Sequence, residues 1–205
     1  MRSARFGSSL LLSSASEMVA RRLVIAPGNG CSDIRRSNWY GWLHDKVKSE
    51  GLFEEVKCEN FPDPYDAKRE VWLPFMEKDL QADSEAVIVG HSSGAEAAMR
   101  YAETHKVHGI VLVSACHTDL GDAGERASGY YPPSGGDWKW DDIRENCGYI
   151  VQFHSKDDHL VPVSEGRHVA EQLKSEYHEL DGHSHFFDPF DKLLEVLRAK
   201  QAESK

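Results

Sequence analysis

Short apolar runs alternate with alanine-rich or amphipathic segments along most of this chain. The apolar runs predict buried parallel strands, and the longer segments between them predict helices. Strands are predicted over residues 23–26, 56–62, 85–90, 107–115, 148–155 and 176–182, and helices over residues 39–51, 67–80, 94–105, 138–146, 164–175 and 188–200. This alternation predicts an α/β fold, in which a parallel sheet carries helices on both of its faces.

A turn-rich connection over residues 116–137 follows the fourth predicted strand. It is longer than the loops that usually join elements in compact domains, so we predict that it is a binding loop. Residues 21–200 show no internal repeat and no shift in composition. Their number suits one domain, and we predict a single one.

The overall composition limits the classes of partner. The chain has 205 residues, a formal net charge of −10, and 40% hydrophobic residues, which suits a globular protein. Nucleic acids and anionic membrane surfaces are disfavoured as partners, because a negatively charged protein is repelled by them. No apolar run approaches the roughly 20 residues that a membrane-spanning helix needs. The composition therefore predicts small-molecule partners, with no nucleic acid and no membrane.

Residues 1–20 differ from the rest of the chain. They contain Arg2, Arg5 and many serines, but no acidic residue before Glu17. Such a composition resembles a mitochondrial transit peptide, and a disordered leader is the simpler interpretation. We predict a disordered leader and a cytoplasmic protein, with mitochondrial import as the alternative.

The four cysteines are Cys31, Cys58, Cys116 and Cys147. None belongs to a CxxC pair, and none stands at zinc-finger spacing from histidines. This pattern predicts reduced, mostly buried thiols in an intracellular protein. Polar residues flank Cys58 and Cys147, which makes these two the candidates for exposure.

The sequence Gly90-His91-Ser92-Ser93-Gly94 matches the pattern G-x-S-x-G. The pattern is short, but here an apolar strand precedes it and an alanine-rich helix follows it, which is the setting of a nucleophile elbow. Glycines at both ends let strand and helix approach closely, and the helix N-terminus favours a developing oxyanion. We predict that Ser92 is a nucleophile and that the Ser93 N–H binds the oxyanion. A glycine-rich turn without chemistry is the alternative.

A serine hydroxyl needs a base to accept its proton. After an elbow of this kind, an acid and then a histidine follow in the chain. The loop after the strand at 148–155 offers Asp157 and Asp158 as the acid, and the last loop offers His183 and His185 as the base. His185 precedes two phenylalanines, whose packing beneath the loop would fix its ring, whereas His183 follows a glycine.

The turn after the first predicted strand reads Pro27-Gly28-Asn29-Gly30. In a hydrolase this turn faces the nucleophile, so we predict that the backbone near Gly28 and Asn29 donates the second oxyanion hydrogen bond. A simple turn is the alternative. The turn lacks the G-x-G-x-x-G pattern and the lysine of phosphate-binding loops. The His-Ser-His sequence lacks a third metal ligand, so no metal and no organic cofactor is predicted.

Further segments carry a family resemblance: PGNG at 27–30, WYGW at 39–42, FPDP at 61–64, WLPFME at 72–77, VGHSSGAEAAMRYAETH at 89–105, IVLVSA at 110–115, DLGD at 119–122, ERASGY at 125–130 and YIVQF at 149–153. Over about residues 22–198 the chain resembles the retinoblastoma-binding protein 9 family of serine hydrolases. The resemblance implies an α/β-hydrolase domain with a shortened sheet and little or no lid. It also implies Ser92 as nucleophile, Asp158 as acid and His185 as base. The family has Gly-His-Phe where this chain has Gly-His-Ser-His-Phe, which keeps His183 as the alternative.

The function expected from these residues is hydrolysis of small esters or amides through an acyl-enzyme, of the carboxylesterase or amino-acid ester and aminoacyl type. We expect His91, Trp39, Trp138 and Trp140 to line the pocket. The alternative is a protein-interaction module on a hydrolase scaffold, with secondary or vestigial activity. Binding to the retinoblastoma protein is associated with an L-x-C-x-E motif. The aligned stretch at 80–85 lacks the cysteine, so the sequence gives no support for that partner.

Overall fold

The computed structural model describes residues 20–203. Apart from Ala20, the predicted leader lies outside the described residues. The apolar runs form six parallel strands: β1 (Arg22–Ala26), β2 (Glu55–Lys57), β3 (Ala86–His91), β4 (Gly109–Val113), β5 (Ile150–Ser155) and β6 (Glu176–Leu180). Their order in the sheet is β2-β1-β3-β4-β5-β6.

The strand order reverses beside β1, because the chain adds β2 on one side of it and β3 on the other. In the register of β1 and β3, Ala26 is paired with Gly90. The turns that follow these two strands, which carry Gly28 and Ser92, therefore start side by side. Crevices of this kind, at the carboxyl ends of strands where the order reverses, are where open α/β sheets bind ligands.

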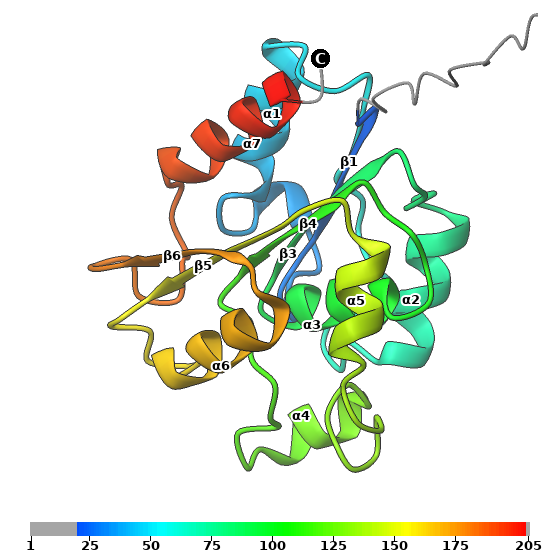
Figure 1. Ribbon diagram of the computed structural model, residues 1–205, viewed down its shortest axis with the longest axis vertical. Helices are drawn as coiled ribbons and strands as arrows, with labels where there is room; N and C mark the ends of the chain where they lie inside the picture. Colours follow the sequence, from blue (N-terminus) through cyan, green and yellow to red (C-terminus); the bar gives the residue numbers. More distant parts are fainter. Residues whose placement is uncertain (1–19, 204–205) are drawn as a thin grey trace, which may run out of the picture.

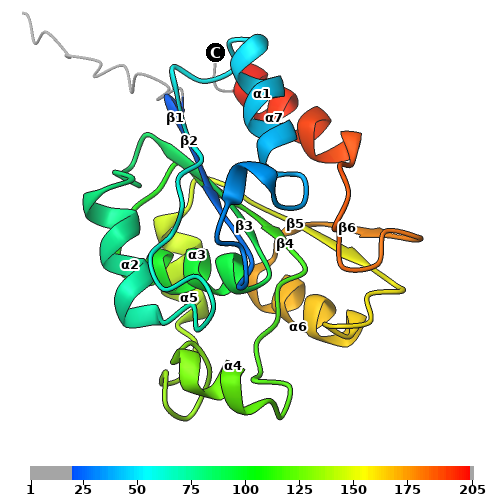
Figure 2. The ribbon, with the colours of Figure 1, turned by 180° about the vertical axis from the view of Figure 1, so that it is seen from behind.

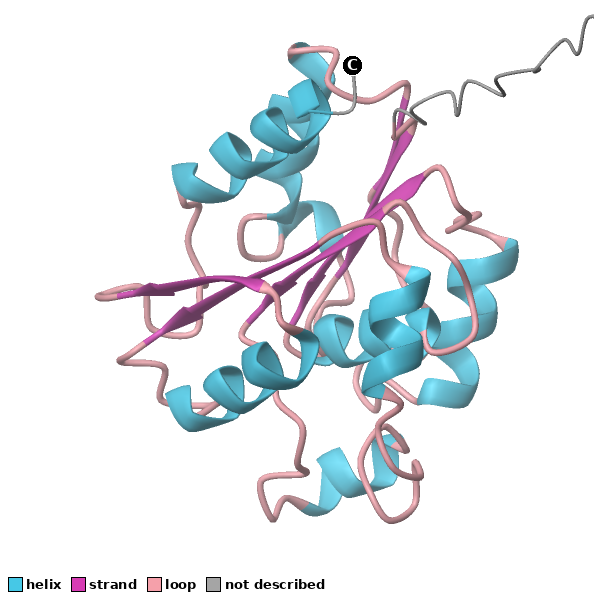
Figure 3. Ribbon diagram, viewed as in Figure 1, coloured by secondary structure: helices cyan, strands magenta, loops and turns pink. Residues whose placement is uncertain are grey.

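Helices cover both faces of the sheet, as the alternation predicts (Figures 1, 2 and 3). One face carries α1 (Tyr40–Ser49) and α7 (Asp191–Glu203), with the short 3-10 helix η1 (Ile34–Arg36) leading into α1. The other face carries α2 (Arg69–Lys78), α3 (Ser93–Ala102), α5 (Trp140–Asn146) and α6 (Val163–Leu173).

The strands separate two hydrophobic cores, because successive side chains point to opposite faces of a sheet. In β1, Leu23 and Ile25 pack with α1 and α7, whereas Val24 and Ala26 pack with α2 and α3. β3 and β4 follow the same alternation and are fully buried. Burial of both faces explains why these strands are continuous apolar runs in the sequence.

The connection over residues 116–137 contains a helix that the sequence pattern did not predict, α4 (Ala123–Ser128). Asp122 caps this helix, because its side chain accepts hydrogen bonds from the N–H groups of Gly124 and Glu125. Gly129 ends it with a φ of 85°. The helix lies beyond the carboxyl ends of the strands, apart from the two helical layers (Figure 1), where it adjoins the crevice.

The strand predicted over residues 56–62 is too long, since β2 ends at Lys57, and the remaining predicted helices and strands agree with the structure to within a few residues at their ends. β3 continues one residue past its predicted end, to His91, and α3 ends at Ala102, three residues early. All four cysteines are free, as predicted, but the exposure expected for Cys58 is wrong: it is buried beneath α1, and its thiol donates to the Tyr40 carbonyl. Between residues 20 and 203, no helix is long and apolar enough to cross a membrane.

Candidate active site

Ser92 forms the sharp turn between β3 and α3. Its φ of 53° and ψ of −126° place a non-glycine residue in a strained region of backbone conformation. The turn is held by neighbours on both sides. The Ser92 N–H donates to the Val113 carbonyl at 2.9 Å. A Cβ on Gly90 would collide with the Gly94 backbone, and one on Gly94 would collide with the Ala26 carbonyl. The two glycines of the motif thus allow the strand and the helix to approach each other closely, as expected.

His185 and Asp158 are in direct contact. The Nδ1 atom of His185 lies 3.0 Å from Oδ1 and 2.9 Å from Oδ2 of Asp158, and both side chains are buried. A carboxylate can only accept hydrogen bonds, so Nδ1 carries the proton in this contact. The neutral ring therefore keeps Nε2 as an acceptor, which is the tautomer that a general base requires.

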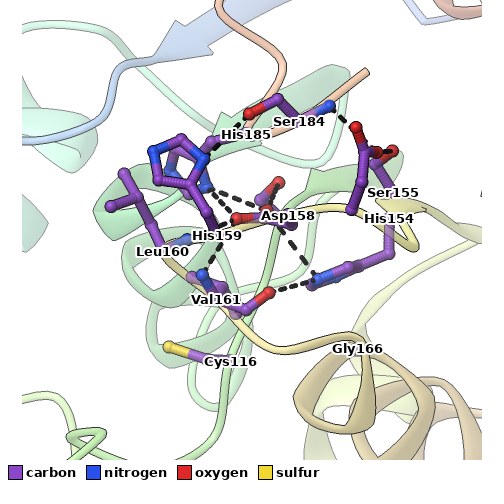
Figure 4. A network of polar contacts seen from close by, with 12 residues as sticks. Cys116, His154, Ser155, Asp158, His159, Leu160, Val161, Gly166, Ser184 and His185 are labelled. Carbon is purple, nitrogen blue, oxygen red and sulfur yellow. Dashed lines mark hydrogen bonds and ion pairs between the residues drawn. The ribbon is translucent and has the colours of Figure 1, made fainter. Parts of the chain in front are cut away.

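Asp158 lies at the centre of a wider network (Figure 4). Its Oδ2 accepts the Ser114 hydroxyl at 2.7 Å, and its Oδ1 accepts the N–H groups of Leu160 and Val161 at 3.0 and 2.9 Å. Burial alone would raise the pKa of Asp158, but hydrogen bonds from His185, Val161 and Ser114 outweigh it and lower the pKa to about 2. Asp158 is therefore an anion that faces His185 across the whole physiological pH range.

His154, in β5, supports the loop that carries Asp158 and Val161. Its Nε2 donates to the Val161 carbonyl at 3.0 Å and lies 3.8 Å from Oδ2 of Asp158 (Figure 4). Burial lowers the pKa of His154 and keeps its ring neutral. The sequence analysis did not select this histidine or Ser114. The available signal was their position at or next to strand ends, which many residues share.

The two alternative residues, Asp157 and His183, have other contacts. Asp157 accepts the Ser155 hydroxyl at 2.5 Å and the N–H groups of Gly182 and Ser184 at 3.1 and 3.2 Å. The His183 ring stacks on Phe186 with centroids 5.2 Å apart. Asp157 thus fastens the loop that carries the histidines, whereas Asp158 holds the His185 ring itself.

A second chain of hydrogen bonds runs through Tyr40 and His91. The Gly28 N–H donates to the Tyr40 hydroxyl at 2.9 Å, and this hydroxyl lies 2.7 Å from Nδ1 of His91. On the other side of the ring, Nε2 of His91 lies 2.9 Å from the His185 carbonyl oxygen. A carbonyl only accepts, so Nε2 is the protonated nitrogen and the Tyr40 hydroxyl donates to Nδ1. Burial lowers the pKa of His91 to about 3, which keeps this ring neutral.

The turn at Gly28 approaches the elbow closely, as expected. A Cβ built on Gly28 would lie 3.4 Å from the Ser92 Cβ. The Gly28 N–H, however, is already bonded to Tyr40. Of the two residues predicted to offer the second oxyanion donor, Gly28 therefore has its N–H engaged by another group. Ser93, the predicted first donor, begins α3, and the first N–H groups of a helix have no partner within it.

A cavity of about 360 Å³ opens at the carboxyl ends of the strands. Its lining includes Ser92 and His185 together with Gly28, Asn29 and His91. The remaining lining residues are Asn38, Glu96, Cys116, Leu120, Asp122, Glu125, Tyr131, Leu160, Val161 and Phe187. The predicted nucleophile, the predicted base and the predicted oxyanion turn thus share one hollow.

Carboxyl groups give this cavity its electrostatic character. Glu96, Asp122 and Glu125 line it, whereas none of the described lining residues is a lysine or an arginine. Burial raises the pKa of Glu96 well above its ordinary value, and its Oε1 accepts the Cys116 N–H at 2.9 Å. Burial also raises the pKa of Glu125. Burial thus favours the neutral forms of these two carboxyl groups, so the cavity suits neutral ligands, and a cationic group placed beside Glu125 would favour its anionic form.

Glu125 comes from α4, the helix that the sequence pattern missed. Its Oε2 accepts the Tyr131 hydroxyl at 3.0 Å, and its Oε1 accepts the Asn29 side chain at 3.4 Å. The long connection over residues 116–137 thus contributes side chains to the cavity that Ser92 lines, and its role in binding stays a prediction. The residues involved were not predicted, because a helix of six residues leaves only a weak periodic signal.

The prediction that three tryptophans line the pocket is wrong. Trp39 is fully buried in the core, where its ring packs against Tyr40, His91 and Phe190. Trp138 and Trp140 stack on each other with centroids 5.4 Å apart and line a separate hollow beside α5. Their apolar surface covers the helical layer instead of the substrate cavity. Among residues 20–203, no group of three or more His, Cys, Asp or Glu side chains is arranged to hold a metal ion.

Comparison with known proteins identifies the family. The family model described as serine hydrolase matches residues 23–189. The chain belongs to the serine hydrolase family. It is 43% identical to serine hydrolase RBBP9 of Rattus norvegicus over 179 residues, which cover 87% of this chain and 94% of the relative.

Solved structures share the fold of this serine hydrolase. The ydeN gene product from B. subtilis superposes with a TM-score of 0.76 at 23% identity, covering 89% of this chain and 99% of that one. The esterase RhEst1 from Rhodococcus sp. ECU1013 superposes with a TM-score of 0.60 at 16% identity, covering 91% and 92%. These likenesses show an α/β-hydrolase fold, and with the family assignment they identify this serine hydrolase as an enzyme.

Proposed function

We propose that the enzyme cleaves small esters or amides with a triad of Ser92, His185 and Asp158. The observation that carries the proposal is the contact of His185 Nδ1 with the Asp158 carboxylate, at 2.9 Å, beside the cavity that Ser92 lines. This contact leaves Nε2 of His185 free to accept the proton of a serine hydroxyl.

In the proposed reaction, Ser92 Oγ attacks the substrate carbonyl carbon while Nε2 of His185 takes the hydroxyl proton. The tetrahedral intermediate then breaks its bond to the leaving oxygen or nitrogen, which receives that proton from His185. The resulting acyl-enzyme is hydrolysed by a water molecule that His185 deprotonates in the same way, and the proton returns to Ser92 Oγ. The Asp158 carboxylate stabilises the imidazolium in both steps.

The developing oxyanion is assigned to the N–H groups of Ser93 and Asn29. Ser93 begins α3, where unpaired N–H groups and the positive end of the helix dipole coincide. Asn29 is assigned in preference to Gly28, because the Gly28 N–H is already bonded to Tyr40. Loss of one oxyanion donor typically costs about 3 kcal/mol of transition-state stabilisation, so this pair would carry a large share of the rate enhancement.

The cavity favours substrates of the amino-acid ester or amide type. Glu125 faces the cavity with hydrogen bonds from Tyr131 and Asn29, both of which stabilise its anionic form. A protonated amine on the acyl group would pair with this carboxylate, and the pairing would offset the cost of its partial burial. A substrate with a free carboxylate would find no lysine or arginine among the described lining residues to pair with it.

The proposal can be tested with a fluorophosphonate probe and with intact-protein mass spectrometry. The wild type should be labelled on Ser92 and should show a transient mass increase equal to the acyl group of an activated ester. The Ser92→Ala variant should show neither change, while Ser84→Ala, at an exposed position, should behave as the wild type. Equal labelling of the wild type and Ser92→Ala would refute the proposal.

A further inference from the structure

Exposed apolar side chains gather at the mouth of the cavity. Among residues 20–203, four large hydrophobic side chains are exposed: Tyr65, Leu120, Leu160 and Phe187, at 69%, 38%, 50% and 44%. Three of these four, Leu120, Leu160 and Phe187, line the cavity that contains Ser92. We call these three residues the apolar rim. Apolar groups that remain in water beside a pocket are typical of ligand-binding surfaces.

Two of the three rim residues, Leu160 and Phe187, are attached to the loops that carry the proposed catalytic groups, whereas Leu120 precedes α4. The Leu160 N–H donates to Oδ1 of Asp158 at 3.0 Å, so the acid itself fixes the backbone of Leu160. The Phe187 ring lies 5.5 Å, centroid to centroid, from the His185 ring. Leu160 and Phe187 thus stand beside the Asp158–His185 pair, whereas Glu125 belongs to α4 and bonds to the turn at Asn29.

This arrangement has a consequence for the orientation of the substrate. In the proposed mechanism His185 delivers a proton to the leaving oxygen or nitrogen, so the leaving group must lie next to the His185 ring. Phe187 lies beside that ring, and Leu160, next to Asp158, belongs to the same cavity lining. The acyl group is left with the polar part of the cavity, where Glu125 and Asn29 lie.

We propose that the apolar rim is a binding subsite for an alkyl or aryl leaving group of the substrate. The inference rests on the proposed hydrolase function and adds which end of the substrate is apolar. The preferred substrates then have a small, polar or cationic acyl group and an apolar alcohol or amine. Covering the rim with a leaving group removes apolar surface from water on both partners, which favours longer leaving groups.

The test compares ethyl and hexyl esters of the same amino acid, because their leaving alkoxides have similar basicity and differ mainly in apolar area. Each fully buried methylene contributes up to about fourfold in affinity. The rim is half-exposed, so we expect a wild-type kcat/KM about tenfold higher for the hexyl ester. The combined variant Leu160→Ser/Phe187→Ser should reduce this preference to about twofold, chiefly through KM. The conservative variant Leu160→Ile/Phe187→Leu should largely retain it.

Two controls isolate the rim. Tyr65→Ser removes the other large, exposed hydrophobic side chain of residues 20–203, which lies outside the cavity lining, and it should leave the hexyl preference unchanged. Activated esters of acetate and hexanoate with one common leaving group vary only the acyl length. If the serine variant alters the acyl-length preference and leaves the alcohol-length preference intact, the leaving-group assignment is wrong.

The outcomes also separate this inference from the proposed function. Turnover of both esters at equal efficiency by the wild type would overturn the subsite while leaving the hydrolase proposal in place. Absence of turnover together with absence of fluorophosphonate labelling at Ser92 would refute both the subsite and the proposed hydrolase function.

Discussion

The His91 ring donates from Nε2 to the backbone carbonyl of His185, with 2.9 Å between nitrogen and oxygen. Through Tyr40, the same ring is connected to the N–H of Gly28. The residue that precedes the nucleophile therefore joins the loop of the proposed base to the turn of the proposed oxyanion site. These three segments are far apart in the sequence, and the buried chain of hydrogen bonds fixes their relative positions.

Removal of the Tyr40 hydroxyl should disturb all three segments. In the Tyr40→Phe variant, the Gly28 N–H and Nδ1 of His91 both lose a buried partner. Leaving a buried polar group unsatisfied costs about 1–3 kcal/mol, so we expect the free energy of unfolding in urea to fall by about that amount and kcat to fall several-fold. Tyr65→Phe removes a hydroxyl from an exposed ring and should change neither quantity. Unchanged stability in Tyr40→Phe would contradict the role given to this hydroxyl.

The two neighbouring aspartates should differ sharply in their effect on turnover. Asp158→Asn replaces an acceptor with a group that can donate, which favours the tautomer of His185 with its proton on Nε2. We expect kcat to fall by about a thousandfold or more. Asp157→Asn keeps an acceptor oxygen for the N–H groups of Gly182 and Ser184, so its kcat should fall less than tenfold. Similar losses in the two variants would argue against Asp158 as the acid.

The two histidines of the last loop provide a second comparison. His185→Ala removes the ring that contacts Asp158, and we expect kcat to fall at least a thousandfold and the free energy of unfolding to fall by about 1–3 kcal/mol, because the buried carboxylate loses a partner. His183→Ala removes a ring that stacks on Phe186, and its effect should appear mainly as a small loss of stability. Steady-state kinetics and urea denaturation of both variants decide the matter. A greater loss of kcat in His183→Ala than in His185→Ala would identify His183 as the base.

The regular parts of the fold and the elbow were predictable because their signals are local. Fully buried parallel strands are apolar throughout, and the glycines around Ser92 reflect collisions between adjacent segments. The choice of Asp158 came from family resemblance, and the choice of His185 came from that resemblance and from the two phenylalanines that follow it, since each has a residue of the same type close by. Local sequence does not show which of two neighbouring side chains points inward.

The contacts that the sequence did not reveal are long-range. Tyr40 lies in a helix with ordinary amphipathic spacing, and its bonds to Gly28 and His91 depend on how α1 docks against the sheet. Trp39 and Trp138 were assigned to the pocket from residue type alone. Large aromatic residues are more often used to fill cores, as both are here.

Glu125 should govern selectivity for the acyl group. In Glu125→Gln the side chain keeps its shape but loses its negative charge, so an ammonium group gains nothing from it. We expect kcat/KM for an amino-acid ester to fall about tenfold, while the value for the N-acetylated ester should stay within twofold or rise. Mass spectrometry of the acyl-enzyme would show at which step the loss occurs. An equal loss for both esters would indicate that Glu125 only supports the fold of α4.

Glu96 should make the stability of the enzyme depend on pH in a direction opposite to that of most carboxylates. Burial raises its pKa in the folded state well above the value of about 4.3 in an unfolded chain. Below pH 4.3 both states bind the proton and the folded state incurs no penalty. As the pH rises above 4.3, the unfolded state releases the proton first, so this group's contribution to stability is progressively lost until the pH reaches the folded-state pKa.

The Glu96→Gln variant isolates this effect, because glutamine is neutral at every pH and retains an oxygen for the Cys116 N–H. Its free energy of unfolding relative to the wild type should increase between pH 4 and pH 7, by up to about 1.4 kcal/mol per pH unit within the window. Glu171→Gln, at an exposed position on α6, serves as the control, and urea denaturation across this range provides the measurement. A difference between Glu96→Gln and the wild type that stays constant with pH would mean that Glu96 is ionised in the folded enzyme. Glu96 would then contribute a negative charge to the cavity lining, and a cationic acyl group would interact with Glu96 as well as with Glu125.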